Sequence, residues 1–294
     1  MKPEVFFLAS GMSKNQQRFC LFYPAQGPDV QGLVLYIHPF AEEMNKARRM
    51  AALQSRSFAR AGYAVLQIDL LGCGDSAGDF GDATWQHWVN DVVLGYHWLR
   101  ARHAAQGAPA ELAPLWLWGL RAGCLLAAQA AQQLAEPVNY LFWNAPASGK
   151  LLLQQFLRLK VAGDMLSGNA RGVMDGLRKN LALGCAVEIA GYQLSSELAL
   201  GLEASTLLPP ALKTPPSRME WLDVATHGDA SMSPVSRASI EAWHQTGYRI
   251  RSQRVCGPAF WQSGEIEEVP ALIDASTTAI SGALEADSPL REAA

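Results

Sequence analysis

The chain has 294 residues, of which 49% are hydrophobic and 17% are charged, and its formal net charge is -3. This composition is typical of a globular protein with a large core, and an α/β chain of this length often forms one domain. The mildly acidic balance gives no general attraction to nucleic acid or to anionic lipid. We therefore expect partners of another kind.

The cysteines are scattered and lack the spacing of a zinc site or a disulfide framework; they are Cys20, Cys73, Cys124, Cys185 and Cys256. We expect reduced thiols, no metal and no cofactor. The apolar stretch Val5–Ala9 is too short for a signal peptide, and no run approaches the roughly 18 apolar residues of a membrane span. These features predict a soluble cytoplasmic protein.

Short apolar runs alternate along the chain with longer helical patterns. The expected strands are Val5–Ala9, Arg18–Tyr23, Leu33–Ile37, Ala64–Ile68, Leu115–Trp118, Tyr140–Trp143, Met219–Asp223 and Arg249–Val255. The expected helices are Lys46–Arg60, Trp85–Arg102, Ala122–Leu134, Val235–Gln245 and Ile266–Ile280. Continuous apolar strands alternating with helices predict a mostly parallel sheet with helices on both faces.

Two segments depart from the alternation. The first two strands are joined by a short Gly/Ser/Asn-containing connection, which predicts an antiparallel hairpin at the edge of the sheet. Residues 147–216 are mostly helical and predict a small cap over the carboxyl ends of the strands, where ligands bind in open α/β sheets. The core is then residues 1–146 and 217–283, and the tail 284–294 is expected to be frayed.

Four landmarks follow one another in the sequence. His38-Pro39-Phe40 comes after a buried strand, and the turn Asp69-Leu70-Leu71-Gly72-Cys73-Gly74-Asp75-Ser76 comes after the next strand. A third strand then leads into Gly119-Leu120-Arg121-Ala122-Gly123 and a helix of small residues, and Gly228-Asp229 lies late in the chain. Each landmark is weak alone, but their order together is specific.

In this order the landmarks resemble the α/β-hydrolase superfamily over nearly the whole chain. The resemblance implies an eight-stranded sheet in which Arg121 stands at the nucleophile position and Asp229 at the acid position. Ala259 stands near the position of the histidine base. It also implies an oxyanion hole built from the backbone N–H of Ala122 and that of Phe40 or Ala41, because proline at position 39 has no N–H.

Two longer phrases are similar to the exosortase A system-associated hydrolases of type 2. They are His38-Pro39-Phe40-Ala41-Glu42-Glu43-Met44-Asn45-Lys46 and Gly257-Pro258-Ala259-Phe260-Trp261-Gln262, which continues to Glu265-Ile266-Glu267-Glu268. That resemblance implies an association with loci for exopolysaccharide and PEP-CTERM protein export. The name hydrolase in that family rests on superfamily membership, so it does not establish an activity.

Arg121 is not a nucleophile, because a guanidinium stays protonated. No histidine occurs after His244, so the base position after the last strand is also lost. Cys124 and Cys73 are alternative nucleophiles, although small buried apolar roles are more usual for such cysteines. His227, close to Asp229, is the best remaining candidate base.

Other residues have two interpretations each. The glycines around Arg121 form either a true elbow or simple strand–helix packing. His38 is expected to orient the oxyanion loop and not to act as a base. Glu42 and Glu43 are either a solvated pair or partners of Arg121. Several tryptophans are core residues or walls of an apolar ligand site: Trp116, Trp118, Trp143 and Trp261.

Three functions remain open. The first is a degenerate hydrolase that binds a small anionic or acyl ligand at Arg121, whose planar fork suits a carboxylate or phosphate. The second is an esterase or thioesterase with a non-standard constellation. The third is a scaffold for proteins of the exopolysaccharide machinery. In each case an unpaired buried guanidinium is costly, so we expect Arg121 to contact Glu42, Glu43, Asp229 or a bound anion.

Overall fold

The computed structural model describes residues 2–11, 16–105, 113–166, 172–214, 217–226 and 231–282. Its main sheet has eight strands in the order β1-β2-β4-β3-β5-β6-β9-β10. They are β1 (Glu4–Ala9), β2 (Gln17–Tyr23), β3 (Gly32–Ile37), β4 (Tyr63–Ile68), β5 (Leu115–Leu120), β6 (Asn139–Trp143), β9 (Arg218–Ala225) and β10 (Arg249–Cys256). All eight expected strands are confirmed.

The first strands form the predicted hairpin at the edge of the sheet. β1 pairs antiparallel with β2, and β2 pairs antiparallel with β4. Every other neighbouring pair is parallel. The carboxyl ends of β3, β5, β6 and β9 therefore meet at one edge, where the loops that follow them lie together.

Helices cover both faces of the sheet. The helices around the sheet are α1 (Glu42–Arg60), α2 (Trp85–Ala104), α3 (Ala122–Ala131), α7 (Pro234–Gln245) and α8 (Pro270–Ser281). Strand β3 shows why two layers form: Val34 and Tyr36 pack in the cluster that contains α1 and α8. Leu33, Leu35 and Ile37 point to the cluster that contains α2, α3 and α7. The successive residues of a strand face opposite ways, so an all-apolar strand needs a helix layer on each side.

Three helix boundaries differ from the sequence prediction by three residues or more. α1 begins at Glu42, four residues earlier than expected, and α8 begins at Pro270 and not at Ile266. Proline is favoured in the first turn of a helix because its missing N–H has no intrahelical partner there. α3 ends at Ala131, three residues before Leu134.

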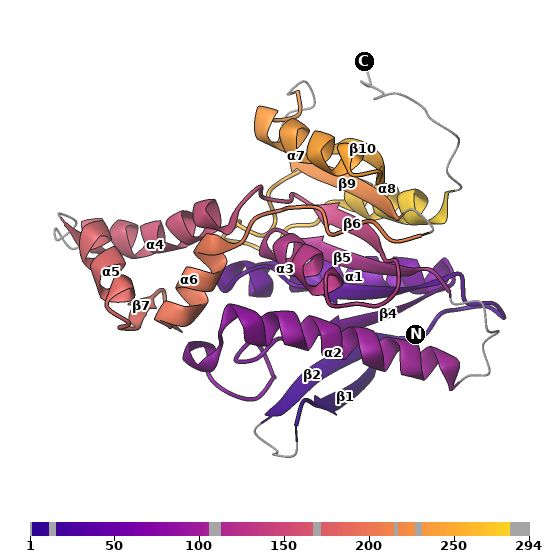
Figure 1. Cartoon of the computed structure of the whole chain (residues 1–294), viewed down its shortest axis with the longest axis horizontal. Helices are drawn as coiled ribbons and strands as arrows, with labels where there is room; N and C mark the ends of the chain where they lie inside the picture. The colour runs from indigo at the N-terminus through magenta and orange to yellow at the C-terminus, as the bar shows by residue number, and fades with distance from the viewer. Residues whose placement is uncertain are drawn as a thin grey trace.

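The segment between β6 and β9 carries α4 (Gly149–Leu166), α5 (Val173–Ala182) and α6 (Ser196–Ala204). Figure 1 shows these helices together at one end of the molecule. A hairpin of β7 (Val187–Ile189) and β8 (Tyr192–Leu194), which was not predicted, lies between α5 and α6. Its two-residue turn has positive φ at both Ala190 (50°) and Gly191 (85°), as a tight hairpin turn requires.

This insertion contacts the core at the carboxyl edge of the sheet. The ring of Phe156 on α4 lies 5.1 Å from that of Phe40 in the loop after β3. The ring of Tyr192 on β8 lies 5.0 Å from that of Phe80, in the short helix η2 (Phe80–Asp82). The predicted tail 284–294 lies outside the described residues. Within them, no helix is long and apolar enough to cross a membrane.

Candidate functional site

The chain turns sharply from β5 into α3 at Arg121, whose backbone has φ 54° and ψ -115°. A left-handed conformation of this kind costs a non-glycine residue about 1–3 kcal/mol. The surrounding structure holds it: the N–H of Arg121 donates to the carbonyl of Trp143 (3.0 Å), and the carbonyl of Arg121 accepts from Cys124 (3.0 Å). The Gly119–Gly123 run is therefore an elbow, and the alternative of simple packing is wrong.

The two glycines of the elbow are required by close backbone contacts. A Cβ on Gly123 would lie 2.1 Å from the carbonyl oxygen of Ile37, at the end of β3. A Cβ on Gly119 would lie 2.6 Å from the nitrogen of Cys124. Both distances are far below any tolerated contact, so only glycine lets α3 begin directly against the loop that follows β3. This approach brings Ala122 beside the His38–Ala41 loop.

The side chain of Arg121 is held by two neighbouring elements. Its Nη2 and Nε lie 3.2 Å and 3.3 Å from Oε1 of Glu43, in the first turn of α1. Nη2 also donates to Oε1 of Gln155 on α4 (2.5 Å). The charged side chains are 13% and 11% exposed. The expectation of a carboxylate partner for Arg121 is confirmed, and Glu43 is that partner.

Burial raises the pKa values of both glutamates beside Arg121. Desolvation raises the pKa of Glu43, and the neighbouring positive charge of Arg121 acts in the opposite direction without cancelling it. Desolvation also raises the pKa of Glu42, with a smaller opposing influence from Lys46 and Arg121. Oε2 of Glu42 is buried and accepts no hydrogen bond from the described residues. The two glutamates therefore do not form a solvated surface pair.

His38 supports the loop between β3 and α1. Its Nδ1 lies 2.8 Å from the carbonyl oxygen of Pro39, and its Nε2 accepts from the N–H of Leu70 at 3.2 Å. The second contact requires Nε2 to be unprotonated, so Nδ1 carries the proton and the ring is neutral. Burial lowers the pKa of this imidazole. With both nitrogens engaged, His38 orients the loop and has no free nitrogen for a base.

The backbone N–H groups expected at an oxyanion hole are available. In the hydrogen bonds of the described residues, the N–H groups of Phe40, Ala41 and Ala122 have no acceptor. Ala41 has φ 50° and stands directly before α1, as Arg121 stands directly before α3. Helix starts leave such donors unsatisfied, and they carry a positive partial charge. The elbow thus retains donors for a negatively charged or carbonyl oxygen.

Ala259 stands near the position that the resemblance gives to the histidine base. Ala259 lies in the loop after β10 and packs against the core cluster of Trp118, Trp143 and Phe260. Asp229, predicted at the acid position, and His227, the candidate base, both lie outside the described residues, so these assignments stay predictions. Asp223 on β9 is bonded to Trp221 Nε1 at 2.9 Å, and burial raises its pKa.

The two cysteines near the site do not serve as displaced nucleophiles. Cys124 and Cys73 are both buried, and burial raises the pKa of both thiols. The thiolate is the nucleophilic form, so these thiols are unreactive at neutral pH. No cluster of three or more acidic, histidine or cysteine side chains in the described ranges could hold a metal. The tryptophans at 116, 118, 143 and 261 are buried core residues.

Sequence reasoning missed Gln155. The helical pattern placed α4 in an insertion, but it did not show which of its faces would lie over the elbow. The sequence also did not predict the contact of Lys46, whose Nζ lies 3.3 Å from the carbonyl oxygen of Gln262 after β10. Contacts of this kind join segments that are distant in sequence and leave no local signature.

Comparison with known proteins agrees with this geometry. The model of the family described as serine aminopeptidase, S33, matches residues 28–171, a segment that includes the elbow. No curated protein matches the chain significantly. Together, the strand order, the elbow and the structural likenesses below establish that the chain has the α/β-hydrolase fold.

Several solved structures share this fold at low sequence identity. Est1E from Butyrivibrio proteoclasticus with ferulic acid has a TM-score of 0.60 and 15% identity, over 90% of this chain and 93% of that chain. A soluble variant of monoglyceride lipase from Saccharomyces cerevisiae has a TM-score of 0.56 and 14% identity, over 95% of both chains. An α/β serine hydrolase homologue from Coxiella burnetii has a TM-score of 0.55 and 11% identity, over 95% and 98%.

Proposed function

We propose that this protein is a non-hydrolytic α/β-hydrolase-fold protein that binds a small anionic or acyl ligand at its elbow. The observation that carries the proposal is Arg121 at the nucleophile position, ion-paired with Glu43 and bonded to Gln155. A protonated guanidinium attacks no carbonyl carbon, and no histidine follows β10 to activate a nucleophile or water. The elbow therefore keeps groups that can bind a ligand, but it lacks a nucleophile at position 121 and a histidine after β10.

The remaining groups of the elbow suit an oxygen-rich ligand head. The free N–H groups of Phe40, Ala41 and Ala122 can donate to a carboxylate, a phosphate or a thioester carbonyl. Arg121 adds a planar fork that pairs with carboxylates. Because burial raises the pKa of Glu43, a ligand carboxylate can take its place at Arg121 while Glu43 takes up a proton. This exchange keeps the buried charges balanced.

Ligand binding is tested with octanoate by isothermal titration calorimetry, in two buffers of different ionisation enthalpy at neutral pH. The expected result is saturable binding with net proton uptake, because Glu43 becomes protonated. The Arg121→Gln variant should bind at least about tenfold more weakly, as expected when a charge-assisted contact is lost. Binding that is unchanged in that variant would place the ligand elsewhere.

Hydrolysis is tested in parallel with a fluorophosphonate probe and a p-nitrophenyl ester. The native protein should form no adduct and show no turnover above the buffer rate. Arg121→Ser should add at most slow turnover, since no histidine follows β10 to act as the base at the family's position. A stoichiometric adduct on a serine facing the elbow would favour the alternative, an esterase or thioesterase with a non-standard constellation.

The two phrases that resemble the type 2 exosortase A-associated hydrolases support a further part of the proposal. The protein acts in the cytoplasm with proteins of an exopolysaccharide or PEP-CTERM export locus, and its described cysteines are all free thiols. Affinity purification from cells that carry such a locus tests this association. Recovery of a locus protein by both the native chain and Arg121→Gln would favour the scaffold alternative, in which the elbow ligand plays no part.

A further inference from the structure

The two outermost strands of the main sheet differ in the side chains that they carry. β10 forms one edge and bears Arg249, Arg251 and Arg254. β1 forms the other edge, near the lower margin of Figure 1, and Glu4 is its single charged residue. Charged side chains on an edge strand oppose pairing with another chain, whereas an apolar edge is a template for it. The β1 edge is therefore the one suited to accept a further strand.

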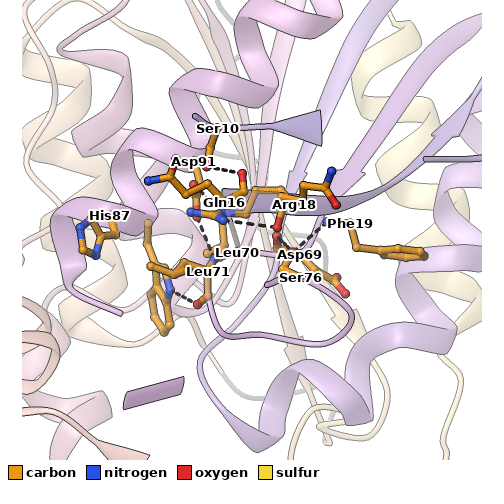
Figure 2. Close-up of polar contacts among 12 residues, drawn as sticks. Ser10, Gln16, Arg18, Phe19, Asp69, Leu70, Leu71, Ser76, His87 and Asp91 are labelled. Atoms are coloured by element: carbon orange, nitrogen blue, oxygen red, sulfur yellow. Dashed lines mark hydrogen bonds and ion pairs between the residues drawn. The ribbon is translucent and has the colours of Figure 1, made fainter. Parts of the chain in front are cut away.

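One face of the β1–β2 hairpin is fixed to α2. The rings of Phe6 on β1 and Trp98 on α2 are stacked, with their centroids 4.6 Å apart. On β2, Nε of Arg18 lies 2.8 Å from Oδ1 of Asp91, and Figure 2 shows this pair beside Ser10 at the end of β1. These contacts hold the edge strand in place on the body of the protein, so its outer side is an ordered surface.

The opposite face of the hairpin is apolar and open. Val5 and Phe7 lie on this face of β1 and are 62% and 53% exposed. Leu21 of β2 pairs with Val5, and Phe19 pairs with Phe7, with their rings 5.7 Å apart. Among the described residues, β2 is the only strand that pairs with β1. Single exposed apolar residues are ordinary, but a contiguous apolar strip beside an unpaired strand edge is typical of an interaction surface.

The sequence of β1 is complementary to a second copy of itself. In an antiparallel pair with Phe6 on the two-fold axis, Val5 of each copy lies opposite Phe7 of the other. Because residues two apart share a face, these pairs join the apolar strips of the two copies into one. Glu4 is already paired with Arg102 of its own chain at 3.0 Å. The two strands therefore meet without an unpaired carboxylate on either.

The charges at the ends of this antiparallel pair also favour it. The register places the exposed Lys2 of each copy opposite Ser10 of the other. Ser10 lines a hollow between the hairpin and α2, and the exposed carboxylates Asp79 and Asp82 line the same hollow. A register shifted by two residues would instead bring Glu4 opposite Ser10, on the side of those carboxylates. Charge complementarity thus selects the register in which lysine approaches the acidic side chains.

We propose that this chain forms a two-fold symmetric dimer through β1, in which the sheet continues from one copy into the other. The proposal is independent of the elbow, which lies between β5 and α3. A contact made by one strand and its neighbours belongs to the small class of specific interfaces, below roughly 1,200 Å² in total. We therefore expect a reversible dimer with a dissociation constant of about 10 µM.

Sedimentation velocity of the full chain tests the dimer over a range from about 1 to about 200 µM. The native chain should pass from one to two chains per particle as its concentration rises. Phe7→Lys should stay monomeric, because a lysine replaces the apolar partner of Val5. Leu200→Lys on α6 is the matched control, since Leu200 is 52% exposed, nearly as much as Phe7. That variant should dimerise as the native chain does.

Two double variants test the register. Val5→Lys combined with Phe7→Glu places lysine opposite glutamate at both pairs, and this chain should dimerise within about tenfold of the native affinity. Val5→Lys combined with Phe7→Lys places like charges opposite each other and should stay monomeric. Both chains change the same exposed positions, so a difference between them reports pairing and not folding. Lys2→Glu should weaken the native dimer several-fold, because it opposes Asp79 and Asp82.

Each contrary outcome has a distinct meaning. A native chain that stays monomeric at all these concentrations would overturn the proposal and leave the β1 edge to a strand of another protein. A dimer that persists in Phe7→Lys would lie on a different surface. Equal behaviour of the two double variants would contradict the proposed register. Arg121→Gln should dimerise as the native chain does, so a failure of octanoate binding at the elbow leaves this result readable.

Discussion

Two of the buried arginine–carboxylate pairs, Arg121–Glu43 and Arg18–Asp91, differ in the number of elements that each arginine contacts. At the elbow, Arg121 contacts Glu43 through two nitrogens and also donates to Gln155 of α4. On β2, Arg18 contacts Asp91 of α2 and the carbonyl oxygen of the neighbouring Gln17. Both pairs join a strand or strand end to a helix, yet only the first is completed by a third element.

Each ion pair therefore connects a different set of helices and strands. The Arg121 contacts join the start of α1, the elbow and α4, so the protein's own groups surround the guanidinium at the elbow. The Arg18 pair joins β2 to α2, and Oδ2 of Asp91 also accepts the N–H of Leu71. The ligand proposed for the elbow must compete with Glu43 for Arg121, whereas the Arg18–Asp91 pair is a contact between two elements of the fold.

The largest effects should come from removing one carboxylate of each pair. Asp91→Ala should lower the free energy of unfolding by about 4 kcal/mol and Glu43→Ala by about 3 kcal/mol, because each leaves a buried guanidinium uncompensated. The loss of stability in Glu43→Ala should be smaller, because Arg121 still donates a hydrogen bond to Gln155 and the side chains of Arg121 and Glu43 are slightly more exposed. Urea unfolding followed by tryptophan fluorescence measures both.

Double variants check the reason for these losses. Asp91→Leu combined with Arg18→Met should recover most of the stability lost in Asp91→Ala, since apolar replacements remove both buried charges. A loss below about 0.5 kcal/mol in either single variant would be that of an ordinary surface change. That result would mean that the ion pair concerned contributes little to the stability of the folded protein.

A smaller effect should follow from the close glycine contact at the elbow. In Gly123→Ala, the added Cβ would lie 2.1 Å from the carbonyl oxygen of Ile37, a backbone atom that cannot rotate away. Overpacking of this kind should cost about 2 kcal/mol. Thermal unfolding measures the loss of stability. The same substitution should weaken octanoate binding, because it separates the start of α3 from the His38–Ala41 loop.

Gly163→Ala is the matched control for that substitution. It lies on α4, where an added Cβ meets nothing within 4 Å. Alanine is the better helix former, so this variant should gain up to about 1 kcal/mol. Equal effects of the two substitutions would mean that the close approach at Gly123 has no energetic consequence.

Much of this architecture follows from local sequence. Apolar runs such as Leu33–Ile37 predicted the central strands of the main sheet, because burial on both faces leaves no room for polar alternation. The Gly119–Gly123 spacing predicted the elbow, and the charge of Arg121 predicted a carboxylate partner. In each case one residue type has few physical alternatives.

Other features depended on tertiary contacts. The β7–β8 hairpin was missed because its strands have three residues each, too few to show a period. Gln155 and the Arg18–Asp91 pair were missed because side chains distant in sequence meet only after the helices pack.

The smallest expected effect concerns Glu42, the elbow carboxylate without a partner for Oε2. The start of α1 favours a negative charge there by about 0.3–1 kcal/mol, but desolvation prevails and the pKa of Glu42 is raised above 4.5. The folded state therefore binds this proton more tightly than the unfolded state. The stability that protonated Glu42 contributes is complete below pH 4.5 and is lost as the pH rises through the folded-state pKa.

Glu42→Gln, neutral throughout, should exceed the native protein in stability at pH 7 by less than about 1 kcal/mol. The gain should vanish below pH 4.5, whereas Glu241→Gln, exposed on α7, should show no such crossover. Urea unfolding across this pH range measures the difference, and a Glu42→Gln variant less stable than the native chain at pH 7 would mean that the helix start outweighs burial.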